Sequence, residues 1–338
     1  MPRILLTQAI HPQAERQLAT LGEVSVAADT DAATLRREAR GSDVIVVRAP
    51  LPDDIFTAAP RLIGAVRHGA GVDMIPVEMA SAHGVLVANV PGANAVSVAE
   101  HVLLKLLQLA RRSATLETTL RSAGWRAARA LADAGSELVG RSLGLIGYGH
   151  VGQAVARLCG EGLSMQVRAY TRRGGLANAP HWVEPAASLP ALLEGSDYLV
   201  LACPLTEQTR GLIGAPELAR LRPGACIVNV ARGPVIDTDA LVEALRSGHL
   251  GGAALDVFDP QPLPDGHPLW SMSNVLITPH VAGITDDSMR RMGEGAALAV
   301  ASLLRGELPP HCINPQAVPA FLRRFRALKS VDTGQPWS

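Results

Sequence analysis

Aromatic residues and net charge are both scarce in this chain of 338 residues. Phe, Trp and Tyr together make up 3% of it, so an aliphatic, alanine-rich core has to supply the apolar burial. Lys and Arg number 31, and Asp and Glu also number 31, which gives a formal net charge of zero. No overall basic field attracts nucleic acid or a membrane surface, and we expect neither as a partner.

Long apolar runs, secretion signals and metal motifs are missing as well. No run approaches the roughly 20 residues that a membrane span needs. The opening MPRILLTQAI lacks the long apolar region and cleavage site of a signal peptide, which favours a cytoplasmic protein. No cluster of His, Cys and Asp has metal-ligand spacing, so we expect no metal. The cysteines lack CxxC spacing and fit free thiols: Cys159, Cys203, Cys226 and Cys312.

Short β-branched runs alternate with segments of helical spacing in two series. The first series predicts strands over residues 3–7, 24–27, 43–47, 62–66 and 85–89. The second predicts strands over residues 142–147, 166–171, 197–203, 225–230, 252–257 and 275–278. Such alternation predicts an α/β fold with two doubly wound parallel sheets, each covered on both faces. We also expect one long apolar helix from Ser97 to about residue 122, and a final helix over about 285–305.

The stretch LGLIGYGHVG, residues 143–152, ends a predicted strand on glycines in GxGxxG spacing, and VGQAVARLCGEG continues with helical spacing. In that setting the glycines permit a tight turn, close approach to a pyrophosphate, and close helix–strand packing. The helix N-terminus offers N–H groups and a partial positive charge to the phosphates. We therefore predict a dinucleotide site, with a purely structural turn as the alternative. Its residues are Gly147, Tyr148, Gly149, His150, Val151 and Gly152.

The end of the next predicted strand bears on which dinucleotide is bound. An NAD site usually places an acidic residue there for the ribose hydroxyls, whereas this sequence has Thr171, Arg172 and Arg173. No carboxylate is present to repel a 2′-phosphate, and two guanidinium groups can bind one. The alternative is a pair of solvated surface arginines. We expect NADP as the preferred cofactor and keep NAD as the alternative.

Five motifs follow one another along the chain: SVAEH (97–101), ELVGRSLGLIGYGHVG (137–152), VNVARGPVID (228–237), ALDVFDPQPLPDGHPLW (254–270) and ITPHVAG (277–283). In order and spacing they resemble the D-isomer-specific 2-hydroxyacid dehydrogenase family, in its glyoxylate/hydroxypyruvate reductase-like branch. The resemblance covers about residue 3 to 315. It implies an NAD(P)-dependent oxidoreductase that reduces a small 2-keto acid to the D-2-hydroxy acid by hydride transfer. Glyoxylate, hydroxypyruvate, phenylpyruvate and branched 2-keto acids all remain open as the substrate.

The resemblance also implies how the two sheets are organised. A flavodoxin-like substrate domain, residues 1–96 plus 285–315, is expected to be interrupted by a Rossmann nucleotide domain, residues 97–284. The active site is expected in the cleft between these domains. Family members are commonly dimers, so we expect a homodimer paired through the nucleotide domains and the long helix. Residues 316–338 form a tail that the resemblance does not cover.

Two charged residues carry the chemistry that the resemblance implies. Arg232, in VARG, would bind the substrate carboxylate bidentately and polarise the neighbouring keto oxygen. His280, in TPHVAG, would donate a proton to that oxygen as hydride reaches the carbon, and would take it back in the oxidation. A surface ion pair for Arg232 and a structural role for His280 are the alternatives. Asp256, in LDVF, would sit near the nicotinamide, with loop or helix capping as its alternative.

The resemblance places further residues around the two ligands. Substrate is expected to meet backbone N–H groups in two turns, at Arg48 and Ala49 and at Gly69 and Ala70. The cofactor is expected to be lined by Cys203, Pro204, Thr209, Val230, Ala231 and Gly283. His68 and His101 fit packing or the edge of the cleft better than they fit catalysis.

Gln261, in DPQP, departs from the family pattern, in which most members have a glutamate paired with the catalytic histidine. A glutamine can orient the imidazole of His280 by a hydrogen bond, but it cannot stabilise imidazolium by charge. Asp259, two residues upstream, is a candidate source of the missing charge. Formate dehydrogenases of the same superfamily also carry glutamine in a similar stretch, so formate oxidation is one alternative function. Against it, Ala70 in HGAGVD is more typical of the hydroxyacid enzymes.

A third candidate function comes from another class, the nucleotide-binding regulators without catalysis. A chain in which the arginine or the histidine of these motifs had been lost would favour that class. Arg232 and His280 are both intact, which argues for an enzyme.

Overall fold

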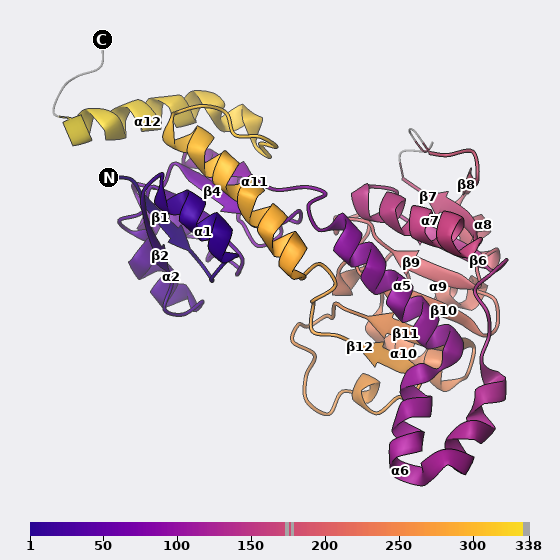
Figure 1. The fold of residues 1–338 in the computed structure, drawn as a ribbon. Helices are drawn as coiled ribbons and strands as arrows, with labels where there is room; N and C mark the ends of the chain where they lie inside the picture. The colour runs from indigo at the N-terminus through magenta and orange to yellow at the C-terminus, as the bar shows by residue number, and fades with distance from the viewer. Residues whose placement is uncertain (173–175, 177–178, 334–338) are drawn as a thin grey trace. The chain divides into compact units, whose positions relative to one another are not determined.

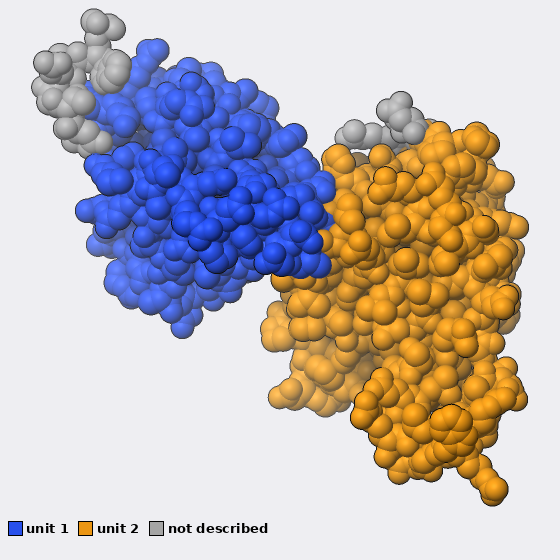
Figure 2. All heavy atoms as spheres, in the orientation of Figure 1, with its two compact units in different colours: residues 1–94, 285–338 blue, residues 95–284 orange. Residues whose placement is uncertain are grey.

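The computed structural model of the protein describes residues 1–172, 176 and 179–333, and the chain forms two compact units (Figure 2). Unit 1 comprises Met1–Asn94 and Thr285–Ser338, and unit 2 comprises Ala95–Ile284. Each unit is built around its own parallel sheet with helices on both faces, so the predicted fold class is confirmed. No helix in the described ranges is long and apolar enough to cross a membrane.

Unit 1 contains a five-stranded parallel sheet in the flavodoxin-like order β2-β1-β3-β4-β5. The strands are β1 (Arg3–Leu6), β2 (Glu23–Val26), β3 (Val44–Val47), β4 (Gly64–Arg67) and β5 (Leu86–Ala88). One face of the sheet packs against α1 (Pro12–Ala19), α11 (Asp286–Leu304) and α12 (Val318–Thr333). The other face packs against α2 (Ala32–Ala39), α3 (Ile55–Ala58) and α4 (Val77–Ala82). Because both faces are covered, all four residues of the apolar run in β3 are buried.

Unit 2 contains a seven-stranded parallel sheet in the order β12-β11-β10-β9-β6-β7-β8 (Figure 1). The strands are β6 (Ser142–Ile146), β7 (Gln166–Tyr170), β8 (Val183–Pro185), β9 (Tyr198–Leu201), β10 (Ala225–Asn229), β11 (Leu250–Leu255) and β12 (Val275–Ile277). One face packs against α5 (Ala95–Arg111) and α7 (His150–Leu163). The other packs against α8 (Leu189–Glu194), α9 (Ala215–Arg220) and α10 (Thr238–Arg246).

The strand β6 shows how sequence and topology combine in unit 2. Its side chains alternate between the faces with the period of two that a strand imposes: Leu143 and Leu145 pack towards α5 and α7. Gly144 faces the other way, where a Cβ would lie 2.2 Å from the hydroxyl oxygen of Ser196. The strand also lies between β7 and β9, at the point where the winding of the sheet reverses. Ligands of open α/β sheets bind at the carboxyl ends of the strands at such a switch point.

The expectation of one helix from Ser97 to about residue 122 is wrong. The helix α5 ends at Arg111, and Arg112 adopts a left-handed φ of 51° before α6 (Ser113–Leu131) begins (Figure 1). Within α6, Gly124 has a non-helical φ of 79°. The helical periodicity continues across both positions, so the pattern alone did not reveal the breaks. The short strand β8 was likewise not predicted.

The tail that the family resemblance does not cover contains a helix, α12, which packs against unit 1. Phe321 in α12 is 1% exposed, and Arg324 donates hydrogen bonds to the carbonyl oxygens of Pro60 at 2.7 Å and Leu62 at 2.8 Å. Just before α12, the side chain of Asn314 is completely buried and accepts the N–H of a β5 residue. Through these contacts α12 packs against the core of unit 1.

Candidate active site

The glycine turn between β6 and α7 has the backbone geometry that close contact with a phosphate requires. Gly147 adopts a left-handed φ of 98°, and a Cβ there would lie 2.8 Å from the carbonyl oxygen of Ala202. A Cβ at Gly152 would lie 2.2 Å from the carbonyl oxygen of Gly147, so α7 approaches β6 only with glycine here. A Cβ at Gly149 would meet no described atom within 4 Å, and no side chain caps α7 at this residue. The space at Gly149 and the uncapped helix N-terminus fit a dinucleotide pyrophosphate.

The residues that we expected to select the cofactor follow β7, next to this turn. The N–H of Gly147 donates to the carbonyl oxygen of Tyr170, the last residue of β7, at 2.9 Å. Arg172, two residues later, directs its guanidinium to the side-chain oxygen of Gln208. Arg173 lies outside the described residues. The chain thus carries Arg172 just beyond the strand end that the glycine turn bonds, and its contact with a 2′-phosphate stays a prediction.

The loop after β9 is held in shape by a buried threonine. The hydroxyl of Thr209 donates to the carbonyl oxygen of Pro204 at 2.7 Å and accepts the N–H of Thr206 at 2.7 Å. Cys203 at the start of this loop is buried, and burial raises the pKa of its thiol, which stays protonated at neutral pH. Hydrogen bonds thus hold the backbone of this loop, and its contact with the cofactor stays a prediction.

Asn229, the last residue of β10, shapes the turn that carries Arg232. Its Nδ2 donates to the carbonyl oxygen of Arg232 at 3.0 Å, and its Oδ1 accepts the N–H of Ala231 at 3.0 Å. The N–H of Val230 donates to the carbonyl oxygen of Leu201 in β9 at 3.2 Å. The Arg232 guanidinium is half-buried and donates to the carbonyl oxygen of Ala231 at 2.7 Å. The backbone that carries this arginine is therefore fixed by hydrogen bonds on both sides.

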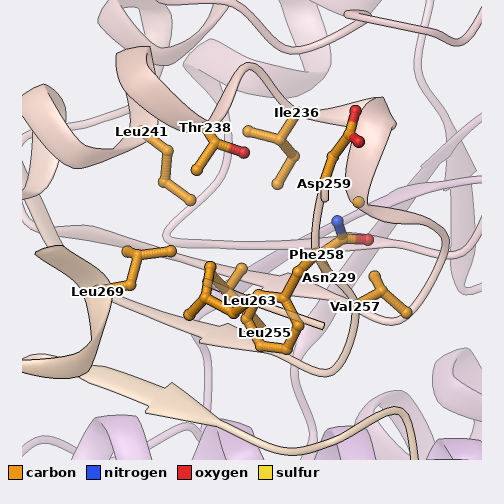
Figure 3. A pocket seen from close by; sticks show the side chains of 11 residues that line it. Asn229, Ile236, Thr238, Leu241, Leu255, Val257, Phe258, Asp259, Leu263 and Leu269 are labelled. Atoms are coloured by element: carbon orange, nitrogen blue, oxygen red, sulfur yellow. The ribbon is translucent and has the colours of Figure 1, made fainter. Parts of the chain in front are cut away.

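The turn that carries Arg232 packs against the loop that carries Gln261. A Cβ at Gly233 would lie 2.0 Å from the backbone carbonyl oxygen of Phe258, so only glycine allows this approach. Behind the turn lies a cavity of about 10 Å³, lined largely by apolar side chains such as Ile236 and Leu241 (Figure 3). Room of this size holds at most one water molecule. The cavity therefore belongs to the support of the turn and is too small for a keto acid.

His280 and Gln261 are brought together at this edge of the sheet, as the sequence predicted. The Nδ1 atom of His280 lies 3.0 Å from the side-chain Nε2 of Gln261. Because a carboxamide N–H only donates, Nδ1 accepts this hydrogen bond, and the neutral imidazole carries its proton on Nε2. His280 also has a left-handed φ of 55°, which is uncommon for a residue with a Cβ. Asp259, which we considered as a charged partner of His280, is exposed and borders the cavity of Figure 3.

Asp256, after β11, holds the turn in which His280 lies. Its side chain is buried, at 3% exposure of the residue. Oδ1 accepts the hydroxyl of Thr278 at 2.7 Å and the N–H of Val281 at 2.9 Å, and Oδ2 accepts the N–H of Ala282 at 2.9 Å. The carboxylate thus performs the loop-capping role that was the alternative in the sequence analysis. Its contact with the nicotinamide, and that of the neighbouring Gly283, stay predictions.

In unit 1, the first turn that we expected to meet the substrate is tied to the end of β1. The hydroxyl of Thr7 accepts the N–H of Arg48 at 2.8 Å and the N–H of Ala49 at 3.1 Å. The two N–H groups that we expected to face the substrate therefore have a partner within unit 1. Contact of these residues with the substrate would have to come from their side chains or from other backbone atoms.

The second turn of unit 1 is held by two polar side chains. Arg67 donates from its guanidinium to the carbonyl oxygen of His68 at 2.8 Å, and Asn89 donates to the carbonyl oxygen of Ala70 at 2.6 Å. Gly69 has a φ of 142°, which glycine adopts readily. The turn is thus well defined, and contact of Gly69 and Ala70 with the substrate stays a prediction.

Comparison with known families identifies the chain. The family model described as D-isomer specific 2-hydroxyacid dehydrogenase, NAD binding domain, matches residues 103–282, more than half of the chain. The chain belongs to this family. The glyoxylate reductase of Thermococcus gammatolerans is 33% identical over 334 residues, which cover 96% of this chain and 99% of that protein. The D-3-phosphoglycerate dehydrogenase of Methanocaldococcus jannaschii is 35% identical over 322 residues, which cover 94% of this chain and 60% of that longer protein.

Solved structures of similar dehydrogenases share the architecture. An NADPH-dependent glyoxylate/hydroxypyruvate reductase from Sinorhizobium meliloti, in complex with NADP and malonate, is 29% identical with a TM-score of 0.80, over 92% of this chain and 96% of that one. An NAD-dependent formate dehydrogenase from Staphylococcus aureus, in complex with NAD, is 29% identical with a TM-score of 0.76, over 88% of this chain and 93% of that one. These similarities support a nicotinamide dinucleotide and leave NADP and NAD as alternatives.

Several residues that shape the site were absent from the sequence predictions: Thr7, Arg67, Asn229 and Thr278. For Asn229 a signal was present, because an asparagine side chain before a turn commonly bonds the backbone two or three residues later. Thr7 and Thr278 gave no such signal, since their partners lie 41 and 22 residues away in the sequence. Their roles depend on which strand ends the topology places side by side.

His68 should make the stability of this dehydrogenase fold depend on pH. The residue is 3% exposed, Nε2 has no hydrogen-bond partner among the described residues, and burial, with help from Arg48 and Arg67, lowers its pKa to about 4. A folded-state pKa below the unfolded value means that stability falls as pH drops through this interval. The free energy of unfolding of the wild type, relative to His68→Gln, should fall by about 2 to 3 kcal/mol between pH 7 and pH 4.5.

Urea denaturation at a series of pH values measures this difference. The glutamine variant cannot titrate at position 68, so it cancels the contributions of all other groups. Parallel stability curves for the two proteins would show that His68 is protonated equally well in the folded and unfolded chains.

Proposed function

We propose that the protein is an NADP-preferring oxidoreductase that reduces a small 2-keto acid to the D-2-hydroxy acid by hydride transfer. The observation that carries the proton-transfer step of this proposal is the contact of Gln261 with His280, in which the amide engages Nδ1 at 3.0 Å and leaves Nε2 for the proton transfer. Membership of the 2-hydroxyacid dehydrogenase family supports the reaction class. The names of similar proteins, among them glyoxylate reductases, support a small 2-keto acid as substrate.

Each residue of the proposed site has a separate task. Arg232 binds the substrate carboxylate through its planar fork and polarises the keto oxygen beside it. The glycine turn from Gly147 to Gly152 would hold NADPH, which would supply the hydride for the keto carbon. His280, protonated on both ring nitrogens, donates its Nε2 proton to the oxygen and is left neutral. Gln261 orients the ring in both states, because its N–H donates to neutral Nδ1 and, after rotation of the amide, its oxygen accepts from protonated Nδ1.

Formate oxidation is the second candidate, and Gln261 is the observation that favours it. Formate loses hydride to give carbon dioxide, so the reaction needs no proton donor and no charged partner for the histidine. The similarity to the Staphylococcus aureus formate dehydrogenase, 29% identical, keeps this alternative open. The keto-acid proposal has more support because the relatives of higher identity are glyoxylate reductases and phosphoglycerate dehydrogenases.

A substrate panel tests the proposal directly. Purified protein is mixed with NADPH or NADH and with glyoxylate, hydroxypyruvate, phenylpyruvate or a branched 2-keto acid, and the nicotinamide absorbance is followed. Separate reactions contain formate with NADP or NAD. We expect NADPH oxidation with at least one keto acid and no reduction with formate. Turnover of formate alone would support the second candidate, and binding of NADPH without any turnover would support a regulator.

We also propose that the protein is a homodimer in the cytoplasm. Large apolar side chains are exposed on unit 2, with Trp125 of α6 at 76% exposure and Leu104 of α5 at 50%. Exposed apolar and aromatic groups gather at subunit interfaces. Light scattering behind size-exclusion chromatography should give the mass of two chains, and the mass of one chain would refute the dimer.

Arg172 should determine the preference for NADPH. A charge-assisted hydrogen bond to the 2′-phosphate contributes about 1.5 to 3 kcal/mol, so Arg172→Ala should raise the KM for NADPH by about 10- to 150-fold. The KM for NADH should barely change, because NADH has no phosphate there. Arg129→Ala, which removes an exposed arginine paired with Asp133 on α6, is the matched control. Equal use of both cofactors by the wild type would contradict the assignment.

A further inference from the structure

The turn that carries His280 depends on contacts that flank it on both sides. Thr278 precedes His280 and bonds the Asp256 carboxylate through its hydroxyl, while Val281 and Ala282 follow it and bond the same carboxylate through their N–H groups. His280 itself has a φ of 55°. This left-handed conformation costs energy for a residue with a Cβ and persists only where surrounding contacts hold it. The backbone conformation of His280 therefore depends on the position of Asp256.

The hydroxyl of Thr278 links this carboxylate to α5. Asp256 accepts all three of these hydrogen bonds, so Thr278 gives its single hydroxyl proton to Oδ1 of Asp256. The Thr278 oxygen must then accept from its other partner, Nε2 of His101, at 3.3 Å. His101 therefore carries its proton on Nε2. The hydrogen bonds run in one direction, from His101 through Thr278 to Asp256.

A buried cation on the same helix balances the charge of the carboxylate. Lys105 lies one helical turn after His101 and is 8% exposed. Burial lowers the pKa of Lys105, and the negative charge of Asp256 acts in the opposite direction. Burial also lowers the pKa of His101; the charge of Asp256 opposes this, and the charge of Lys105 adds to it. A buried carboxylate without a nearby cation is strongly disfavoured, so α5 provides both a donor chain and a compensating charge.

We propose that His101 and Thr278 are positioning residues of the reaction, which hold Asp256 where it fixes the strained backbone of His280. They act through Asp256 on the direction in which His280 presents Nε2 to the substrate. This inference rests on the proposed function, in which His280 is the proton donor.

The test compares variants that keep or remove single hydrogen bonds. Thr278→Val keeps the shape of the side chain without the hydroxyl, and kcat for keto-acid reduction should fall about tenfold with the KM for NADPH within about twofold. Thr278→Ser restores the hydroxyl and should recover kcat. His101→Leu should resemble Thr278→Val, whereas His101→Gln retains an N–H donor and should lose less. Thr115→Val, which removes a hydroxyl bonded to the Ser273 carbonyl in the same unit, should leave kcat unchanged.

A crystal structure of Thr278→Val gives a readout that does not depend on activity. We expect His280 to leave its left-handed conformation and to lose the bond to Gln261. If both features persist, or if the valine and serine variants have the same kcat, the positioning role is refuted. A wild type that reduces no keto acid would instead refute the proposed function, and the conformation of His280 in the variant would still decide the structural part of the inference.

Discussion

Replacing His280 with alanine should lower kcat for keto-acid reduction by about 10²- to 10⁴-fold, the usual contribution of a general acid. Without the imidazole, the oxygen that gains charge as hydride arrives must take its proton from water. The three hydrogen bonds of Asp256 go to Thr278, Val281 and Ala282 and not to the His280 ring, so the turn should survive the substitution. Steady-state kinetics with the best keto acid of the panel gives kcat, and fluorescence titration gives the NADPH affinity, which should change little.

The chain offers a closely matched control for this experiment. His311 in unit 1 is also a histidine with a left-handed φ, 53°, and it is exposed. His311→Ala therefore repeats the same chemical change at the same kind of backbone position without touching the proposed site. A similar loss of kcat in both variants, or a loss below about tenfold at His280, would remove the general-acid role.

Substituting Gln261 by glutamate should move the alkaline decline of keto-acid reduction to higher pH by about 1 to 3 units. Reduction needs His280 protonated, so the rate falls as rising pH removes this proton. A carboxylate in place of the amide that lies 3.0 Å from Nδ1 would stabilise imidazolium and raise the pKa of the ring. At a pH above the decline of the wild type, the variant should therefore be the faster enzyme. The measurement is kcat/KM against pH for the two proteins.

Asp259→Asn tests, in the same assay, whether Asp259 is the partner of His280 instead of residue 261. Because Gln261 already occupies the hydrogen-bond position at Nδ1 and Asp259 is exposed, the asparagine variant should keep the wild-type profile. A downward shift in Asp259→Asn, with no shift in Gln261→Glu, would make Asp259 the partner of His280. If neither substitution moves the decline, the profile does not report on His280, and its role in proton transfer loses this support.

The sequence by itself determined most of the secondary-structure elements. It also determined several contacts that are local in the chain or that follow from steric limits on the backbone. The apolar β-branched runs predicted eleven of the twelve strands found in the described residues, because a strand buried on both faces needs such residues at nearly every position. The glycine spacing predicted the turn after β6, since a Cβ at Gly147 or Gly152 would clash with the backbone. The pairing of Gln261 with His280 followed from the family motifs, whose order and spacing the chain keeps.

Only the tertiary structure decided the contacts that join distant parts of the chain. The bond from Thr278 to His101 spans 177 residues, and the bonds from Asp256 to the His280 turn span 22 to 26. Such contacts depend on strand order, which places the ends of β11 and β12 side by side and lays α5 across the sheet. The sequence did not predict the break at Arg112 for a related reason. Periodicity indicates which face of a helix is apolar, but it does not indicate whether the helix axis continues. Local sequence thus determines whether a segment forms a helix or a strand. The partner of each polar side chain depends on which segments the tertiary fold brings together.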